Sequence, residues 1–586
     1  MDIFDFLSLI CGLALFLYGM DVMGDALKKG AGNSLKTFLG KMTSNPVKGF
    51  LLGLVVTCII QSSSATTVMV VGFVNAGTMT LLQSVGVIMG ANVGTAITAW
   101  ITGLSGIEAA DDALAIVRWL KTDSWMPILA LVGIIFVMFA KSGKKRYVGA
   151  ILLGFSVLMV GMSQMSDAVS GLKEDAAFKS ILTMFENPIL GVLAGLVLTA
   201  IVQSSSASVG ILQSLTTTGA ITYGAAIPII MGQNIGTCVT ALLSSIGATK
   251  NGRRAAIVHL YFNIIGVVFW LSAFSILDAI FSFAFVSQYI DMWGVAFVHT
   301  VFKILSVILM APFYKWLEKL ACLTIRDGKD GEQSAVNRLD ERLLDTPGVA
   351  VGCATDVTRT MARISAEALL KSIELMENFD PKLAEKIRSL EGEADVLEDS
   401  LGAYLVKISA ENLDEASSKE VTKLLHIIGD FERISDHAVN IVESAEEIKE
   451  KKIEFSKEAQ RELAVMRSAI REILSMTETA FCDENLSLAC EVEPLEEVVD
   501  DIRDEIKRNH ILRVQKNECT IEHGFVLSDI LTNFERVSDH CSNIAGCLIE
   551  VSANDTLEMH KHLSDMRRES DSFDEKYQAY SAKYKI

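Results

Sequence analysis

The sequence predicts an all-α protein in two parts, a polytopic membrane domain followed by a helical cytoplasmic domain. Three observations predict this fold class. Residues 1–312 carry 14 acidic and 17 basic side chains, whereas residues 313–586 carry 57 acidic and 35 basic ones. The first part holds long apolar segments and the second holds long amphipathic ones. Each part also contains an internal repeat. One half therefore has the composition of a lipid-embedded chain and the other that of a water-soluble helical domain.

The composition excludes several classes of protein. The polar half is acidic, so no nucleic-acid partner is expected. The ten cysteines form no C-x-x-C pair, so neither a zinc module nor a disulfide framework is indicated. Asp2 and Asp5 replace the basic residues of a cleaved signal peptide, so we expect the first apolar segment to be retained. No P-loop, kinase triad or His/Cys zinc spacing occurs in the sequence, and we expect neither an enzyme nor an ATP-driven pump.

Nine apolar segments suit the hydrocarbon layer of a bilayer: 4–20, 48–74, 81–103, 126–140, 148–165, 189–217, 225–245, 255–285 and 292–312. Two of them, 48–74 and 189–217, begin at an Asn-Pro pair and carry Gln-Ser-Ser-Ser at their middle. Four consecutive polar side chains suit a re-entrant hairpin with its tip buried in protein, and do not suit a lipid-facing helix. Seven crossings remain.

The basic residues predict how these crossings are oriented. With the N-terminus outside, twelve loop lysines and arginines fall on the cytoplasmic side and four fall outside, in agreement with the positive-inside rule. The acidic half is then cytoplasmic. If both hairpins were full spans, the number of crossings would also be odd, but the cluster Lys144–Arg146 would move outside. We therefore expect a multi-pass protein with an outer N-terminus and a cytoplasmic C-terminal domain.

A gap-free shift of 142 residues aligns the membrane part with itself. Between 45–67 and 187–209, 14 of 23 positions are identical, and the decapeptide that begins at Met89 matches the one that begins at Met231. Three crossings separate equivalent points, so the two copies should be inverted, as in secondary transporters with a substrate site between the repeats. We expect the membrane transport domain to cover 1–315, with inverted repeats at about 4–140 and 146–285 and a last crossing at 292–312.

The polar tips of the two hairpins are the candidate substrate site. A helix that begins at a serine-rich tip directs free backbone N–H groups and its positive dipole end at the tip, which suits a compact oxyanion. Freed carbonyl groups and nearby amide and hydroxyl oxygens suit a hard monovalent cation. Serine and threonine in membrane helices also serve close packing, but the duplication of both motifs favours binding. The candidate residues are Gln61, Ser62, Ser63, Ser64, Thr66, Asn92, Thr95, Gln203, Ser204, Ser205, Ser206, Asn234 and Thr237.

The doubled Gln-Ser-Ser-Ser-Ala, each copy followed by Gly-x-Asn-x-Gly-Thr, resembles the sodium/phosphate cotransporter family, type II and its bacterial relatives. The resemblance covers about residues 1–315. It implies a protein of the bacterial cell (inner) membrane whose hairpins bind inorganic phosphate and the coupling sodium ions. The chain continues the first motif as Ala65-Thr66-Thr67 and the second as Ala207-Ser208-Val209, whereas animal type II members add further Ser/Thr after the first. The number of coupled ions therefore stays open.

Four more ionisable residues lie within the apolar segments: His259, Asp278, His299 and Lys303. His299 and Lys303 are four residues apart and share one helix face. A gating or proton-sensing role is one interpretation, but we favour a structural one, with Lys303 extending toward the membrane surface.

The acidic half predicts six long amphipathic helices, at 348–378, 383–410, 416–450, 456–480, 486–516 and 521–552. A linker at 316–344 precedes them and a polar C-terminal tail at 553–586 follows. The segment beginning at Asp430 recurs at Asn533, a shift of 103, and the segment beginning at Leu390 resembles the one at Leu495. Two copies of three helices predict tandem three-helix bundles over 345–552.

Pairs of carboxylates four residues apart occupy equivalent helices of the two copies. Carboxylates stacked on facing helices repel one another unless cations bridge them, which favours a metal site over a solvated acidic face neutralised by arginines. His437 and His540 follow the aspartates; they are expected to face outward, and a role as extra metal ligands is the alternative. The candidate metal ligands are Glu391, Asp395, Glu432, Asp436, Glu496, Asp500, Glu535 and Asp539.

These acidic motifs are similar to those of the PhoU-like regulatory domains of bacterial phosphate uptake systems. The resemblance covers about 345–550. It implies a divalent or iron-type metal cluster, cytoplasmic regulation, and either a homodimer or a signalling partner that binds through the helices.

The sequence therefore predicts a sodium-coupled inorganic phosphate transporter working by alternating access, with a metal-binding regulatory domain. A membrane phosphate sensor without net transport is one alternative, and a sodium-coupled carrier of another oxyanion is a second, because hydroxyl and amide donors fit any tetrahedral anion. The direction of flux, the metal and the oligomeric state stay open.

Overall fold

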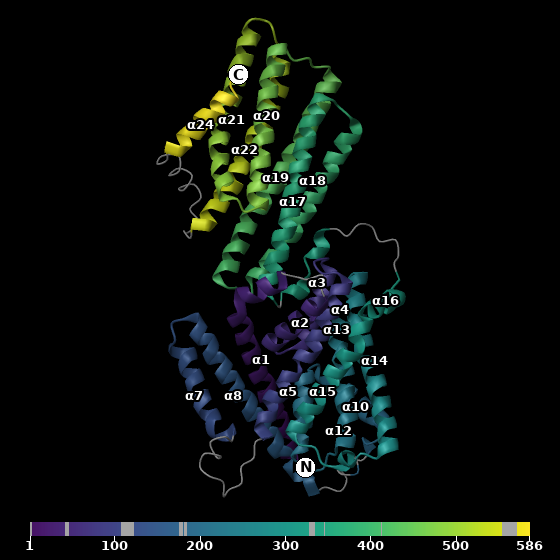
Figure 1. Cartoon of the computed structure of the whole chain (residues 1–586). Coiled ribbons are helices and arrows are strands. Elements are labelled where there is room, and N and C mark those ends of the chain that lie inside the picture. Colours follow the sequence, from purple (N-terminus) through teal and green to yellow (C-terminus); the bar gives the residue numbers. More distant parts are fainter. Residues whose placement is uncertain are drawn as a thin grey trace. The chain divides into compact units, whose positions relative to one another are not determined.

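The computed structural model describes residues 3–40, 46–106, 122–174, 180, 184–326, 335–344, 346–411, 413–553 and 571–586. Within these ranges the chain is helical, and its one β feature is an isolated bridge between Thr222 and Tyr289. The predicted all-α class is confirmed. The helices are labelled in Figure 1. They form two compact units, one of residues 1–332 and 340–346, the other of residues 333–339 and 347–586.

The first unit holds the apolar helices: α1 (Ile3–Gly40), α2 (Pro46–Ile60), α3 (Ser63–Asn75), α4 (Leu81–Gly94), α5 (Ala96–Gly103), α7 (Thr122–Phe139), α8 (Gly143–Ser170), α10 (Pro188–Val202), α11 (Ser205–Thr216), α12 (Tyr223–Gly236), α13 (Cys238–Ser244), α14 (Lys250–Phe281), α15 (Met292–Met310) and α16 (Tyr314–Thr324). Six stretches of the described residues are long and apolar enough to cross a bilayer: Ile3–Gly30, Leu81–Gly106, Gly143–Ser170, Tyr223–Ser244, Lys250–Phe281 and Met292–Thr324. The protein is therefore a multi-pass membrane protein. The remaining predicted crossing, 126–140, falls on α7, whose apolar part is shorter.

The duplication is visible in the packing of the helices. Helix α2 packs on α4 through Gly53 and Gly90, and α10 packs on α12 through their equivalents Gly195 and Gly232. A Cβ atom at any of the four would lie within 2.0 Å of a backbone carbonyl oxygen of the facing helix. Only glycine permits so close an approach. The same backbone contact is thus built twice, 142 residues apart.

Equivalent helices of the two repeats also meet each other. Gly12 of α1 lies against Gly161 of α8, and Gly19 lies against Gly154. Because the residue numbers rise along one helix and fall along the other, α1 and α8 run antiparallel. Inverted repeats require this arrangement where they touch, although the inversion of the repeats as a whole stays a prediction.

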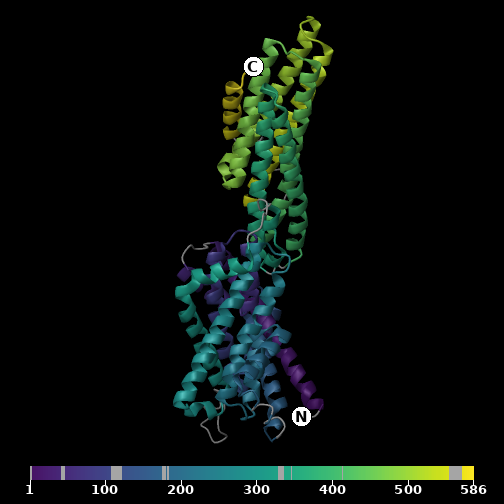
Figure 2. The ribbon, with the colours of Figure 1, turned by 90° about the vertical axis from the view of Figure 1, so that its right-hand side faces the viewer.

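The second unit holds long helices that run side by side in both views of the ribbon (Figures 1 and 2). They are α17 (Pro347–Glu377), α18 (Pro381–Ser409), α19 (Glu415–Lys451), α20 (Lys457–Cys482), α21 (Leu486–Gln515) and α22 (Ile521–Ala553). Helices α17–α19 pack together, as do α20–α22. The predicted six helices in two sets are therefore confirmed. Asp380, Asp414, Ser456 and Asn485 cap four of these helices, each side chain accepting a backbone N–H.

Two segments outside these helices have structure of their own. The end of the predicted linker forms a 3₁₀ turn, η6 (Glu341–Leu343), that packs on α3 in the first unit, and part of that linker lies outside the described residues. The predicted tail contains α24 (Asp571–Lys583), which packs on α21, where Tyr580 donates a hydrogen bond to Glu491 at 3.1 Å. Residues 554–570 of that tail are outside the described residues.

Candidate functional site

The first Gln-Ser-Ser-Ser motif forms a sharp break between α2 and α3. Gln61 takes a left-handed backbone conformation with φ of 59°, and its N–H donates to the carbonyl oxygen of Thr57 at 2.8 Å. Ser62 then caps α3, its hydroxyl oxygen accepting the N–H of Ala65 at 3.1 Å. A left-handed conformation costs a residue with a Cβ about 1–2 kcal/mol. The strained backbone conformation therefore lies at Gln61, the residue that begins the motif.

The second motif repeats this geometry. Gln203 has φ of 55° and donates its N–H to the carbonyl oxygen of Thr199 at 2.8 Å, and Ser204 caps α11 by accepting the N–H of Ala207 at 3.2 Å. Below the tips, Thr57 bonds Thr66 at 3.1 Å and Thr199 bonds Ser208 at 2.8 Å. These hydroxyl pairs are equivalent across the repeat and hold the two helices of each broken pair together.

Each tip presents donors suited to an anion. The first intrahelical bonds of α3 and α11 use the N–H groups of Thr66 and Ser208, so the N–H groups of the serines before them precede the helical ladder. Ser63, Ser205 and Ser206 are buried, and in the described part of the chain no hydrogen bond holds their hydroxyl groups. At either tip, backbone N–H groups, hydroxyl groups and a positive helix end are groups that can replace the hydration of a small oxyanion.

The two tips differ in how their glutamines are held. Gln61 is 6% exposed; its Oε1 accepts the hydroxyl of Thr98 in α5 at 3.0 Å, and its Nε2 donates to the carbonyl oxygen of Cys58 at 2.5 Å. Gln203 is exposed, and its side chain makes no hydrogen bond to the described residues. The equivalent of Thr98, Thr240, bonds the carbonyl oxygen of Thr237 instead. The first tip is therefore closed over its glutamine, and the second tip is open.

The candidate cation ligands lie where the next helices break. Thr95 and Thr237 end α4 and α12, and their hydroxyl groups donate back to helix carbonyl oxygens, to Ala91 at 3.1 Å and to Asn234 at 2.6 Å. Asn92 donates to Asn263 of α14 at 3.1 Å. These side chains are buried, and among the described residues they bond to their own helices or to α14 and not to the hairpin tips.

In the second unit, the candidate metal ligands of α18 and α19 form the first set, and no described basic side chain neutralises their negative charge. Glu391 and Asp395 of α18 face Glu432 and Asp436 of α19, and Glu398 joins them one turn on. Burial and the carboxylate of Asp436 raise the pKa of Glu432 to about 7, and burial with the same neighbour raises the pKa of Glu391. Within the described residues no basic side chain forms an ion pair with any of these carboxylates. This set has the negative charge that a bound cation would relieve.

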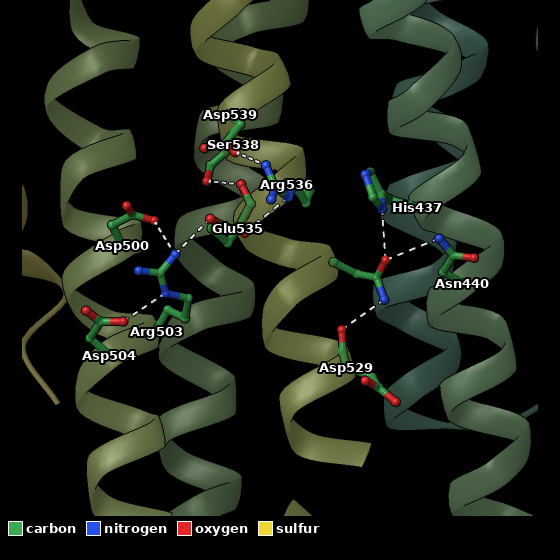
Figure 3. Close-up of polar contacts among 11 residues, drawn as sticks. His437, Asn440, Asp500, Arg503, Asp504, Asp529, Glu535, Arg536, Ser538 and Asp539 are labelled. Atoms are coloured by element: carbon green, nitrogen blue, oxygen red, sulfur yellow. Dashed lines mark hydrogen bonds and ion pairs between the residues drawn. The ribbon is translucent and has the colours of Figure 1, made fainter. Parts of the chain in front are cut away.

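The second set contains its own cation. The Arg503 guanidinium lies 3.2 Å from Asp500 of α21 and 2.8 Å from Glu535 of α22, and its Nε donates to Asp504 at 2.9 Å (Figure 3). Arg536 pairs with Asp539 at 3.2 Å. The shift that aligns Leu495 with Leu390 places Arg503 at the position of Glu398. An arginine thus stands between the carboxylates where the first set has a fifth acid.

The two histidines of the acidic motifs do not face outward, contrary to the expectation. His437 Nδ1 bonds Asn533 at 2.8 Å, and His540 Nδ1 bonds Asp430 at 2.8 Å, so each ring bridges α19 and α22. Figure 3 shows His437 pointing toward the neighbouring helix. The rings stack with centroids 5.7 Å apart. They join the two three-helix sets. Within the described residues no group of three or more His, Cys, Asp or Glu side chains is arranged to hold a metal ion.

Comparison with known proteins gives two family matches. The Na+/Pi-cotransporter model matches residues 15–167 and 157–294, one match for each repeat, and the PhoU domain model matches residues 358–445 and 463–548, one for each three-helix set. YqeW of Bacillus subtilis (strain 168), an uncharacterized protein, is 31% identical over 258 residues, which are 44% of this chain and 78% of YqeW. This chain belongs to the Na+/Pi-cotransporter family. It also carries a PhoU domain.

Other relatives extend the similarity over both units. YjbB of Escherichia coli (strain K12), named as a candidate inorganic phosphate export protein, is 23% identical over 93% of this chain and 97% of its own length. The human sodium-dependent phosphate transport protein 2B is 32% identical over 37% of this chain and 31% of its own length. The crystal structure of PhoU from Streptococcus pneumoniae superposes with a TM-score of 0.33 at 17% identity, covering 36% of this chain and all of that one.

For this family member, sequence reasoning located both tips but missed Thr98 as the residue that holds Gln61. The signal was present, because Thr98 ends the decapeptide that recurs at Met231. It also missed Gln213 of α11, a fully buried side chain that accepts the hydroxyl of Thr102 at 2.5 Å and donates to the carbonyl oxygen of Ala99 at 2.9 Å. Helix α5 therefore contacts both broken helix pairs.

Proposed function

We propose that this Na+/Pi-cotransporter family member moves inorganic phosphate across the membrane, coupled to sodium, by alternating access. The observation that carries the proposal is the pair of equivalent serine-capped tips in different states, Gln61 enclosed and Gln203 open. Alternating access requires two matched half-sites that open in turn, and a single binding site for sensing requires no such pair. Helix α5, bonded to Gln61 through Thr98 and to Gln213 through Thr102, would link the two movements.

Sodium fits the site for an electrostatic reason. Neither hairpin motif contains a lysine or an arginine, so the motifs themselves offer phosphate only the positive ends of their helices. A helix end supplies only about half an elementary charge. Sodium bound beside the anion would supply the remainder, and each ion would then lower the cost of dehydrating the other.

The test is uptake of radiolabelled phosphate into proteoliposomes that contain the purified protein. Sodium-driven uptake should exceed uptake driven by potassium. Gln203→Ala combined with Ser204→Ala should abolish it, whereas Ser272→Ala, an exposed position on α14, should leave it unchanged. Uptake of phosphate without sodium dependence would overturn the coupling. Phosphate binding without flux in the unaltered protein would leave a membrane sensor, and sodium-driven flux of sulfate or arsenate in preference to phosphate would point to another oxyanion.

The direction of net flux follows from the gradients and from regulation. We propose that the protein can release phosphate from cells that hold an excess, because YjbB, the relative that aligns along 93% of this chain, is named for export. Phosphate-loaded proteoliposomes with sodium inside should then lose phosphate. Retention of phosphate under these conditions would limit the protein to import. We keep the orientation predicted above, with an outer N-terminus and a cytoplasmic PhoU domain.

We further propose that the PhoU domain binds metal at its first acidic set and not at its second. No basic side chain of the described residues pairs with the first set, whereas the guanidinium of Arg503 already lies between Asp500 and Glu535. A divalent or iron-type ion would need carboxylate side chains of the first set to rotate toward a common point. Such a metal would signal cytoplasmic conditions to the membrane unit.

Metal content of the purified full chain tests this assignment. Glu432→Gln with Asp436→Asn should remove the bound metal, whereas Glu535→Gln with Asp539→Asn should not. Arg503→Glu, which copies Glu398, should add metal-binding capacity in the second set. Arg508→Glu is the matched control, because Arg508 is an exposed residue of the same helix. Loss of metal from the second-set variant would contradict the proposal.

A further inference from the structure

Helices α14 and α15 carry a matched motif of their own. A shift of 40 residues aligns residues 256–267 with residues 296–307, and six of the twelve positions are identical. His259 aligns with His299 in this match. Asn263 of α14, however, aligns with Lys303 of α15. One helix therefore has a neutral amide where its counterpart has an ammonium group.

All four side chains are buried in the membrane unit. His259 is 4% exposed, His299 is 2% exposed, and Asn263 and Lys303 are each 3% exposed. The sequence interpretation, in which Lys303 extends toward the membrane surface, is therefore wrong. The ammonium lies within electrostatic range of both imidazole rings. The helices are in direct contact nearby, because a Cβ at Gly266 would lie 3.0 Å from the hydroxyl oxygen of Ser306.

The polar atoms of this cluster are unevenly satisfied. The amide of Asn263 accepts from Asn92 at 3.1 Å and donates to the carbonyl oxygen of His259 at 3.0 Å. The Nδ1 atoms of His259 and His299 and the hydroxyl of Ser306, by contrast, are buried and have no hydrogen-bond partner in the described ranges of the chain. Among the described residues, no carboxylate forms an ion pair with Lys303. In the part of the chain that the structure describes, the cluster thus has hydrogen-bond donors and a lysine amino group but no carboxylate paired with them.

Hydrogen bonds connect this cluster to the helices around the first hairpin tip. Trp100 of α5 donates to Thr300, the residue after His299, at 2.9 Å. Two residues earlier on α5, Thr98 holds Gln61. On the other side, Asn92 at the end of α4 bonds Asn263, one turn from His259. The cluster therefore adjoins the helices that hold the first tip.

We propose that Lys303, with His259 and His299 beside it, is a built-in counter-charge that binds the transported tetrahedral oxyanion. The inference rests on the proposed function and deepens it. An ammonium group without a counter-ion inside a membrane protein costs several kcal/mol. An anion removes that cost, and imidazole N–H groups and the Ser306 hydroxyl add hydrogen bonds to it. The fixed charge takes the place of one mobile cation that would otherwise have to enter with the anion.

Phosphate binding to the purified full chain in nanodiscs tests this inference. Lys303→Asn copies the partner helix, and Lys303→Met retains length without charge. Both should weaken binding of radiolabelled phosphate at least about tenfold, as loss of one member of a buried charge pair does. Both should also steepen the sodium dependence by about one ion, since a mobile cation must replace the fixed one. Lys303→Arg should retain most of the affinity, and Lys315→Asn, at an exposed position, should change nothing.

Two readouts separate this role from a structural one. Replacing a buried charge by a methionine side chain should leave the thermal midpoint unchanged or raise it, so lost affinity at retained stability supports the proposal. The unaltered protein should also retain measurable phosphate binding when N-methylglucamine replaces sodium. Absence of that binding, or unchanged affinity and sodium dependence in both neutral variants, would overturn the counter-charge role alone. Absence of phosphate binding in the unaltered protein with sodium present would overturn the proposed function itself.

Discussion

Substitution of Gly232 by alanine tests whether the closeness of the broken helices sets the geometry of the site. The added Cβ would lie 2.0 Å from the carbonyl oxygen of Val192 in α10. Real Cβ contacts stay above 3.0 Å, so α10 and α12 would have to separate by at least 1.0 Å at this point. The obstacle is backbone, which cannot rotate away as a side chain could. We therefore place the cost at the upper end of the range for overpacking, about 3 kcal/mol.

The displacement should reach the candidate site, because Gln203 directly follows α10 and α12 contains Asn234. A misplacement of about 1 Å in a binding geometry can lower a rate about 100-fold. The assay is the initial rate of sodium-driven phosphate uptake, together with the thermal midpoint of the purified protein. Gly171→Ala is the matched control, since a Cβ there would meet nothing within 4 Å. If Gly232→Ala transported and unfolded as Gly171→Ala does, the close packing would not determine the site.

Three further predictions concern single contacts. Thr98→Val removes the hydroxyl that holds Gln61 and leaves the buried Oε1 of Gln61 without that hydrogen bond, at a cost of about 1–3 kcal/mol. The substitution should raise the KM for phosphate in uptake assays. An unchanged KM would exclude this positioning role. In metal-free protein, the pKa of Glu432 is about 7 in the folded state and 4.5 in the unfolded state, so the folded state holds the proton more tightly. The thermal midpoint of the PhoU domain should therefore fall as the pH rises from 4.5 to about 7 and then level off. Glu432→Gln should flatten that slope. Leu343→Ala, at a fully buried side chain of η6 that packs on α3, should lower the free energy of unfolding by about 2–4 kcal/mol in thermal denaturation, whereas Leu323→Ala, 68% exposed, should change it little.

The sequence determined the features that depend on neighbouring residues. The charge split and the apolar segments located the two units, and the helical period located the six helices of the PhoU domain. The two tips were also locally encoded, because a serine cap after an apolar helix specifies a break wherever it occurs. Ser62 and Ser204 accordingly cap α3 and α11 as the duplicated motif predicted.

Only the tertiary structure decided which distant side chains meet. The contact of Thr98 with Gln61, the insertion of Arg503 between two acidic helices, the inward turn of His437 and the burial of Lys303 all depend on how helices pack. A residue's helical face follows from its spacing, but its partner depends on the rotation and crossing of another helix far along the chain. The two acidic sets differ for both kinds of reason, because the sequence puts Arg503 where the first copy has Glu398 and the packing of α21 on α22 brings its guanidinium to Glu535.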